Sequence, residues 1–537
     1  MKRLAVGSAL SFAALAAIMT IALALQVNGI AGPFLSDDMA HMHLIFGFAE
    51  QSALGSWTLV RFYEPLGGGN YAYRPLTFAS YVLDWLAYGE NATGWRVTNL
   101  LLCALNAIAA GIVVSRWLDG RAPQAALAGA LAGCMLFAYP FAGEISYWLI
   151  GRADLLVCLF TLLFFLALPL DRQSTAAQHA LRIVWLLGAL LSKESAIPLP
   201  LIATLLVFAS AATGTGRSDS RILRGVRTAV VEMWPSWMAL LAYVLLRIRL
   251  YGSPWKVYPT LEAPQGIAEL WERFSGIGTI AKENVGAHYL GWTLAAAALV
   301  LAIVLICIRS RRSIPPPKVA LMLTLLAGLV LYLLAPAFSF PVSSPDGEGA
   351  RHFYIAWAYA SLLLGMLSGW ARAPVALGVG LVALMLAGQA NSLVQWQAAG
   401  KRMQEVIVGV EKFAPTIRED QYALLLLPDH IGVALFARSA QGPIVMPPMQ
   451  RQDYLPRMAV MVSAHFTLWS NFIAHGKIAE LKAIPEFDPA NFVGLYCWNP
   501  AKAAFVPLTD GRAALDSALW LATAKRNFPE TGCISPF

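Results

Sequence analysis

The sequence contains few charged residues for its length. Only 13% of its 537 residues are Asp, Glu, Lys or Arg, and 58% are hydrophobic, whereas ordinary globular proteins carry roughly 25% charged residues. With a mean hydropathy of +0.60, this excludes a soluble globular protein and predicts an integral membrane protein. The net charge of +8 does not indicate a nucleic-acid partner, because the basic residues fall in short clusters between apolar runs, as in cytoplasmic loops of membrane proteins.

The sequence also lacks a zinc-binding cysteine spacing, an internal repeat and a low-complexity tract. Cysteines in apolar stretches are expected to be small buried thiols. There are four of these: Cys103, Cys134, Cys158 and Cys307. Cys497 and Cys533 lie in a polar region instead, where they could form a disulfide if that region faces an oxidising compartment.

Long apolar runs are abundant, and runs of roughly 17 to 25 residues predict membrane-spanning helices. The first run follows Lys2 and Arg3, and we interpret it as an uncleaved helix rather than a signal peptide. Residues 181–211 are too long for one span and short for two. Because Arg182 and Arg217 must share the cytoplasmic side, we predict that this stretch crosses twice, as two short helices with the sequence "SKES" at the tip between them. The eleven predicted spans lie near 8–27, 97–115, 122–141, 147–169, 231–250, 287–308, 319–339, 353–370 and 374–390, with two more within 181–211.

The basic loop clusters predict the orientation, because Lys and Arg are retained on the cytoplasmic side. The amino terminus is then cytoplasmic. A membrane domain over 1–390, with a large first outer loop at 28–95, precedes an extracytoplasmic domain over 391–537. In this second domain, short strands and turns are expected in 422–436 and 442–448, and helices near 401–413 and 512–525, so the fold is an all-α polytopic bundle with a small mixed α/β domain.

Two adjacent aspartates, Asp37 and Asp38, follow the first predicted helix. Crowded carboxylates repel each other, so such a pair suggests chemistry: a general base toward a hydroxyl, or oxygen ligands for a divalent metal. The alternative is a helix start capped by Ser36 or Asp37. Asp37, Asp38 and His41 are the candidate ligands for a divalent metal, and the sequence indicates no other cofactor.

Further ionisable residues fall at the predicted outer ends of other spans. Each alone could be an interface anchor, but charges at membrane depth are costly, and as a set they indicate a shared polar site. We interpret them as a basic pocket beside an acidic pair, suited to a lipid-linked phosphate. The candidate residues are Tyr73, Arg74, Glu144, Arg152, Asp154, Lys193, Glu194, Arg351 and His352.

In these stretches the chain resembles a known family. The order of "DD", "YRPLT", "VTNLLLCALNA", "LFAYPFAGEISYWLIGRADLL", "LSKESAIPLP" and "RHFY" resembles the tetratricopeptide-containing transmembrane O-mannosyltransferases and their bacterial relatives, within the GT-C class of membrane glycosyltransferases. The likeness covers roughly residues 30–205, and 345–360 more weakly.

The resemblance implies a GT-C-like helical bundle in a bacterial inner membrane, with the second domain in the periplasm. It also implies sugar transfer, usually with inversion, from a polyprenyl-phosphate donor. Asp37 or Asp38 would be the catalytic base, and Arg74, Arg152, Lys193 and Arg351 would hold the phosphate. The acceptor, whether protein, lipid or polysaccharide, and the sugar are not indicated.

The chain departs from that family in two respects. No 34-residue period follows the membrane region, and Cys103 and Tyr139 stand where relatives commonly have histidine. A transporter or flippase for lipid-linked glycans is the main alternative, although such proteins often show matching halves that this sequence lacks. A non-catalytic membrane scaffold is the third hypothesis.

Overall fold

The structure is a computed structural model. Its description covers the residues 2–51, 54–55, 72–118, 123–168, 173–212, 218–252, 266–310, 316–339, 347–369, 373–438, 440, 442–462, 491–510 and 532–533. The chain divides into two compact units. The helical unit comprises Met1–Gly29, Gly55–Asp84 and Trp95–Leu393, and the mixed unit comprises Ile30–Leu54, Trp85–Gly94 and Val394–Phe537.

A helix occurs at each of the eleven predicted spans. Eight stretches within the described ranges are long and apolar enough to cross a membrane, and two further apolar helices, α6 and α8, are shorter. The eleven helices are α1 (Lys2–Gly29), α5 (Ala92–Trp117), α6 (Pro123–Phe137), α7 (Arg152–Leu166), α8 (Ala176–Ser192), α9 (Leu199–Ala212), α10 (Ser218–Tyr251), α12 (Tyr289–Ser310), α13 (Pro316–Ser339), α14 (Tyr354–Ser368) and α15 (Ala373–Phe413).

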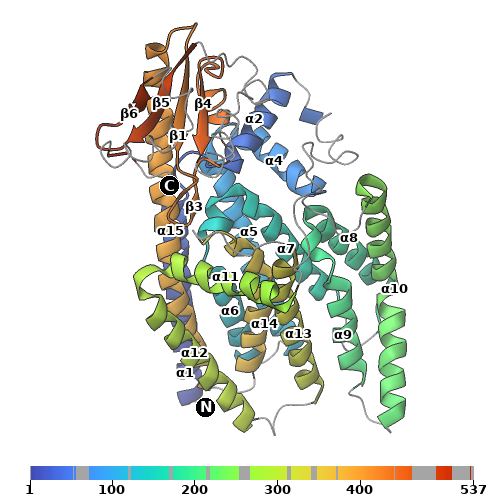
Figure 1. Cartoon of the computed structure of the whole chain (residues 1–537). Coiled ribbons are helices and arrows are strands. Elements are labelled where there is room, and N and C mark those ends of the chain that lie inside the picture. Colours follow the sequence, from blue (N-terminus) through green and yellow to red (C-terminus); the bar gives the residue numbers. More distant parts are fainter. Residues whose placement is uncertain are drawn as a thin grey trace. The chain divides into compact units, whose positions relative to one another are not determined.

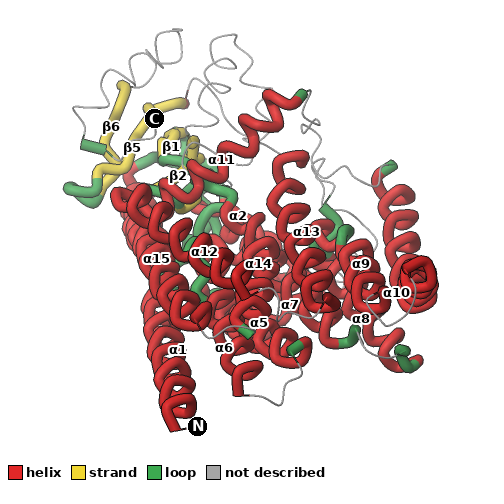
Figure 2. The backbone as a smooth tube through the Cα atoms, turned by 90° about the horizontal axis from the view of Figure 1, so that it is seen from below, coloured by secondary structure: helices red, strands yellow, loops and turns green. Residues whose placement is uncertain are grey.

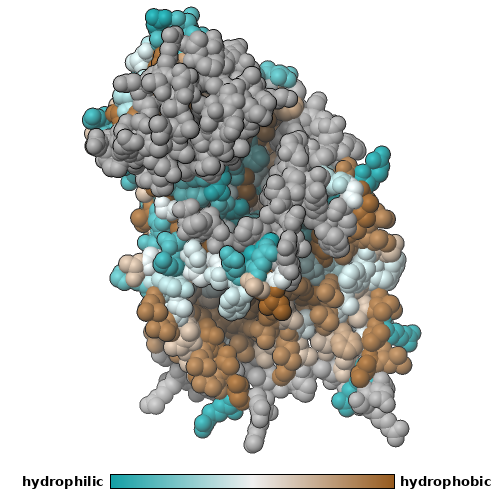
Figure 3. Space-filling view, in the orientation of Figure 1, coloured by the Kyte–Doolittle hydropathy of each residue, from teal (hydrophilic) through white to brown (hydrophobic). Residues whose placement is uncertain are grey.

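The outward faces of these helices are apolar, as a bilayer requires. In Figure 3 brown, hydrophobic side chains form a band across the visible face of the helical unit. Leu223, Val230 and Trp234 on α10, and Leu294 and Leu301 on α12, are exposed. Such surfaces are unfavourable in water and favourable against lipid, so the polytopic membrane fold is confirmed, while the orientation of its termini stays a prediction.

Inside the helical unit, α14 packs against α6, α7 and α13, and Figure 2 shows α5, α6, α7 and α14 side by side at its centre. Small residues bring α5 and α6 close together. A Cβ on Gly129 would meet the Gly111 carbonyl oxygen at 2.4 Å, and one on Gly133 would meet that of Ala107 at 2.7 Å. Backbones that approach this closely are typical of helix pairs in membranes.

The predicted hairpin in 181–211 is confirmed. Thr175 starts α8 with a capping box to Gln178, and Lys193, in an extended conformation, ends it. The short η3 turn (Glu194–Ala196) follows, and α9 then returns. The tip therefore presents Lys193 and Glu194 side by side.

Two further helices lie outside the predicted spans. The predicted first outer loop, 28–95, includes α4 (Pro75–Tyr88). The interval between the predicted spans 231–250 and 287–308 includes α11 (Ile267–Val285), which ends at Gly286 with a φ of 74°. Because this left-handed conformation suits glycine, the chain turns there, and α11 runs in a different direction from α12 (Figure 1).

The mixed unit contains a four-stranded sheet in the order β4-β1-β5-β6. The central strand β1 (Tyr422–Leu427) is buried throughout and pairs in parallel with β4 (Met458–Val462) and β5 (Phe492–Asn499). The strand β6 (Ala504–Asp510) is antiparallel to β5. Strands were predicted in 422–436, where β1 and the short pair β2 (His430–Ile431) and β3 (Ala434–Leu435) occur, whereas β4 to β6 were not predicted.

Other expectations for the tail had different outcomes. Residues 401–413 are helical, as the continuation of α15, and 442–448 contain the short turn η8 (Pro443–Val445) rather than a strand. Cys497 and Cys533 form a disulfide, while Cys103, Cys134 and Cys158 are buried thiols. The predicted helix at 512–525 and the side chain of Cys307 lie outside the described residues.

Candidate functional site

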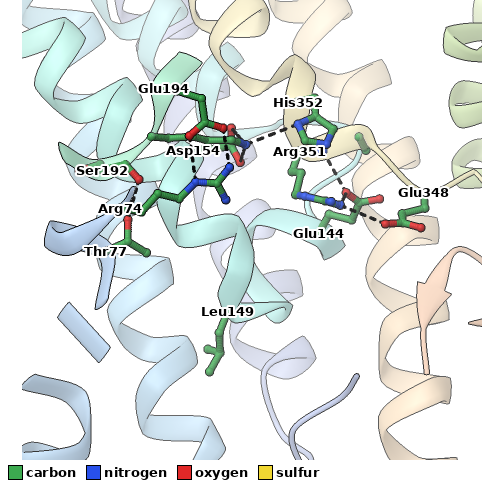
Figure 4. Close-up of polar contacts among 12 residues, drawn as sticks. Arg74, Thr77, Glu144, Leu149, Asp154, Ser192, Glu194, Glu348, Arg351 and His352 are labelled. Atoms are coloured by element: carbon green, nitrogen blue, oxygen red, sulfur yellow. Dashed lines mark hydrogen bonds and ion pairs between the residues drawn. The ribbon is translucent and has the colours of Figure 1, made fainter. Parts of the chain in front are cut away.

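Several predicted polar residues converge in the helical unit where α7, α8 and α14 begin or end. Lys193 is the C-cap residue of α8. Its ammonium donates to both carboxylate oxygens of Asp154, in the first turn of α7, at 2.7 Å each. Its ammonium also lies 3.4 Å from Nδ1 of His352, in the η6 turn (Ala350–Phe353) before α14. In Figure 4, Asp154 and His352 lie near each other in this group. Three segments far apart in the sequence thus meet at one buried point.

A second ion pair lies beside the first. Arg74, just before α4, donates from Nε and Nη2 to the two carboxylate oxygens of Glu194, at 3.1 and 2.5 Å. This two-point geometry matches the planar guanidinium to the carboxylate. Both side chains are 14% exposed, so this pair is more open to an incoming group than Lys193 and Asp154, whose side chains are 6% and 2% exposed.

A third group joins the turn before α7 to the η6 turn. Glu144, in the π-helical turn η1 (Gly143–Tyr147), accepts from the backbone N–H of Gly349 at 2.8 Å and from Nη1 of Arg351 at 3.0 Å. Gly349 has a φ of 116°, a conformation that glycine adopts readily. The Arg351 guanidinium also lies 4.4 Å from the centre of the Trp148 ring, a cation–π contact that fixes its plane.

These surroundings shift the titration of the groups at the centre. Burial, and then the positive charges of Lys193, Arg351 and Arg74, hold the pKa of His352 well below its ordinary value of 6.5. Burial also lowers the pKa of Lys193, against the attraction of Asp154. His352 is therefore neutral at pH 7. Because an ammonium only donates hydrogen bonds, Nδ1 of His352 is the acceptor and its proton is on Nε2.

The site carries charges of both signs. Arg74, Lys193 and Arg351 are interleaved with carboxylates rather than gathered in a purely basic pocket. Burial raises the pKa of Glu144, although the Arg351 charge and two backbone N–H groups oppose that shift. Glu348, 3.6 Å from Arg351, adds a fourth carboxylate to Glu144, Asp154 and Glu194. An arrangement of this kind can hold cations rigidly in place before an anionic group arrives.

Arg152 makes its contacts elsewhere. Its side chain is fully buried and pairs with Asp84 at 2.5 Å, with Asn99 at 2.7 Å and with the Trp95 carbonyl oxygen at 2.9 Å. Burial raises the pKa of Asp84, and the Arg152 charge opposes this shift. A guanidinium saturated in this way anchors the start of α7 between α4 and α5. These contacts hold the guanidinium in place, and no pattern in the sequence indicates the Asp84 and Asn99 partners.

Tyr73 is also a buried packing residue. It is 3% exposed and belongs to the main apolar core of the helical unit, together with Ala22 and Leu100. Tyr139 contributes more directly, because its hydroxyl donates to the Ala350 carbonyl oxygen at 2.5 Å. This bond ties the end of α6 to the η6 turn that carries Arg351 and His352.

The acidic pair belongs to the mixed unit. Asp37 and Asp38 form the first turn of α2 (Asp37–Glu50). Asp38 is fully buried, and Asp37 is half-buried. Ser36 occupies the N-cap position without a side-chain capping hydrogen bond. Capping by Ser36 therefore does not explain why the two aspartates follow it. Among the described residues, no group of three or more His, Cys, Asp or Glu side chains is placed to hold a metal ion.

Gly151, in the "GRADLL" stretch, has a packing role in this site. A Cβ there would meet the Glu144 carbonyl oxygen at 2.1 Å and the Ile145 Cα at 2.9 Å. Both backbone atoms belong to the π-helical turn, so neither can move unless that turn moves too. We expect Gly151→Ala to destabilise the protein by about 1–3 kcal/mol or more and to lower the yield of folded protein.

The matched control for Gly151 is Gly291→Ala in α12, where nothing lies within 4 Å of the added methyl group. Thermal stability should be unchanged or raised there, because alanine favours helix. Equal stability of the two variants in detergent would contradict the packing role of Gly151.

The chain was compared with protein families, curated protein sequences and solved structures, and only solved structures are similar to it. No protein-family model and no curated protein sequence matches this chain. Two solved structures are similar to it. ArnT from Cupriavidus metallidurans in the apo state has a TM-score of 0.44 and 12% identity, over 86% of this chain and 91% of that chain. The same protein bound to undecaprenyl phosphate has a TM-score of 0.43 and 11% identity over the same shares.

Proposed function

We propose that this chain is a membrane glycosyltransferase of the GT-C type, which moves a sugar from a polyprenyl-phosphate donor to an acceptor at the outer face of the membrane. The observation that carries this proposal is the meeting of Arg74, Lys193 and Arg351 around His352. Buried cations brought together from distant segments, at the ends of membrane helices, suit the anionic headgroup of a lipid.

The cations would hold the phosphate of the donor. Arg74 and Arg351 are the more open of the three, and a guanidinium can bind two phosphate oxygens at once. The Nε2–H of neutral His352 is a further donor for a phosphate or sugar oxygen. Lys193, locked between Asp154 and His352, would contribute its charge without reaching far. The apolar polyprenyl chain would lie between membrane helices.

The reaction is a substitution at the anomeric carbon. The acceptor oxygen forms a bond to that carbon while the bond from carbon to the phosphate oxygen breaks, and the electron pair stays on the phosphate. The charge developing on the phosphate is offset by the fixed cations. The proton of the acceptor passes to a carboxylate, and we assign this base to Asp38 or Asp37, with inversion at carbon.

The disulfide supports the proposed location of the tail. Cys497 and Cys533 pair, and disulfides persist in oxidising compartments such as the periplasm. A periplasmic tail, a cytoplasmic amino terminus and a bacterial inner membrane agree with the predicted orientation from basic loops.

The test is sugar transfer by the purified protein in sealed liposomes. Polyprenyl-phosphate-linked pentoses and hexoses with a radiolabelled sugar are supplied on one face, with protein, lipid and polysaccharide fractions as acceptors. The proposal predicts labelled product together with release of polyprenyl phosphate. Movement of intact donor across the bilayer, with no bond broken, would favour a flippase instead.

A further inference from the structure

The helix that carries the acidic pair is attached to the tail of the chain. Residues 30–54 and 394–537 fall in one compact unit, and α2 packs against η8. The buried apolar residues of α2 are Met39, Met42 and Ile45, all fully buried. The first outer segment and the carboxyl-terminal domain therefore form one body, although more than 300 residues separate them in sequence.

Ser36, the residue directly before the acidic pair, is held by a hydrogen bond to the residue that follows β3. The backbone N–H of Ser36 donates to the carbonyl oxygen of Phe436 at 3.0 Å. Ser36 is fully buried and has a φ of 46° and a ψ of −121°, a conformation that costs a non-glycine residue about 1–3 kcal/mol. Such a conformation persists only where the surroundings enforce it, so this contact sets the direction in which α2 starts.

A second contact holds α2 about two turns later. Nδ1 of His43 lies 2.8 Å from the carbonyl oxygen of Pro447. Because a carbonyl oxygen only accepts, Nδ1 of His43 carries the proton and donates. His43 therefore links α2 to the segment that follows η8.

The tail loop that receives Ser36 is itself tied down. The Phe436 N–H donates to the Asp429 carbonyl oxygen at 2.7 Å, and the Val433 N–H donates to Oε1 of Gln395, on α15, at 3.1 Å. Gly432, the residue before Val433, has a φ of 58°, and a Cβ there would lie 2.3 Å from Oε1 of Gln395. A chain of contacts thus runs from α15 through this loop to Ser36.

We infer that the carboxyl-terminal domain positions the acidic pair for catalysis, with His43 and the Gly432 loop as positioning elements. This inference rests on the proposed function, in which Asp37 or Asp38 is the base. The role of the domain then goes beyond that of an appended module, because it holds the helix on which the base would lie.

Two perturbations of the tail contact, each with a matched control, test the inference. Gly432→Ala places a methyl group against the Gln395 amide in a conformation that alanine disfavours, whereas Gly442→Ala, with a φ of −80° and no atom nearer than 3.8 Å, should be neutral. His43→Leu removes the donor to Pro447, whereas His43→Asn retains an N–H near the position of Nδ1.

Two readouts are needed, namely kinetics of sugar transfer and hydrogen–deuterium exchange of α2 peptides. We expect Gly432→Ala and His43→Leu to lower kcat at least about tenfold, with KM within about twofold, and to speed exchange in 37–50. Gly442→Ala should match the wild type, and His43→Asn should recover most of the activity.

The outcomes separate the two proposals. Unchanged exchange in 37–50 in both Gly432→Ala and His43→Leu overturns the inference, whatever the activity. Faster exchange with unchanged kcat also overturns the catalytic positioning. If Asp38→Asn is active as well, the error lies in the assignment of Asp37 or Asp38 as the base. Failure of His43→Asn to recover activity would count against the hydrogen bond as the cause.

Discussion

Replacing Asp38 with asparagine is expected to abolish sugar transfer while leaving the folded protein intact. Asparagine has nearly the shape of aspartate but cannot accept the proton of the acceptor, and loss of a general base costs roughly 10²–10⁴-fold in rate. The loss should appear in kcat, because binding of the lipid phosphate depends on the helical unit. Asp38 is fully buried and Asp37 is not, so we expect the smaller effect from Asp37→Asn.

The control for Asp38 is Glu50→Gln, which removes a carboxylate from the exposed last residue of the same helix. It should retain wild-type turnover. If Asp37→Asn and Asp38→Asn both turn over at the wild-type rate in liposomes, neither carboxylate is the base, and the assignment fails even if the protein is a transferase.

Replacing Lys193 with methionine should have the largest effect on stability. Lys193 and Asp154 are almost completely buried and 2.7 Å apart, and removal of one partner leaves an uncompensated buried charge, which costs about 3–5 kcal/mol. The double variant Lys193→Met/Asp154→Leu removes both charges, and much of the lost stability should return. Activity should not return, because the cation near His352 is absent in both variants.

The comparison for Lys193 is an exposed pair. Arg418 and Asp420 lie 2.5 Å apart at the surface, where ion pairs contribute little, so Arg418→Gln should leave thermal stability unchanged. The measurement is the rate of thermal inactivation and unfolding in detergent. A double variant that is as unstable as Lys193→Met would show that the pair has a packing role, and a double variant with full activity would remove Lys193 from the site.

The sequence predicted the helices better than the tail. Hydrophobic runs and basic loops located eleven helices, and the long run around Lys193 and Glu194 was correctly divided because Arg182 and Arg217 had to share one side. The strand β4 carries no comparable signal, because all of its residues are buried and a strand buried on both faces resembles any short apolar run. The strand β6 is interrupted by Pro507, and proline weakens a strand prediction. The helix α11 was missed because its charged residues mask its apolar face.

The candidate site was predicted as a set of residues but not as a geometry. The positions of Arg74, Lys193, Glu194 and Arg351 at predicted helix ends indicated a shared site, and the structure brings them together. Which carboxylate pairs with which cation depends on tertiary packing, so the partner of Arg152, Asp84, could not be inferred. The contact between Ser36 and Phe436 was equally hidden, because a backbone hydrogen bond leaves no mark on residue type.

The most direct measurement is equilibrium binding of radiolabelled polyprenyl phosphate, and of the neutral polyprenol, to the purified protein and its variants. Charged hydrogen bonds contribute about 1.5–3 kcal/mol each. We therefore predict that Arg74→Gln and Arg351→Gln weaken binding of the phosphate about 10- to 100-fold, leave polyprenol binding unchanged, and differ from the control Arg116→Gln, which has no effect. Equal affinity of the wild type for both lipids, or phosphate binding unaffected by either substitution, would contradict a phosphate site at His352.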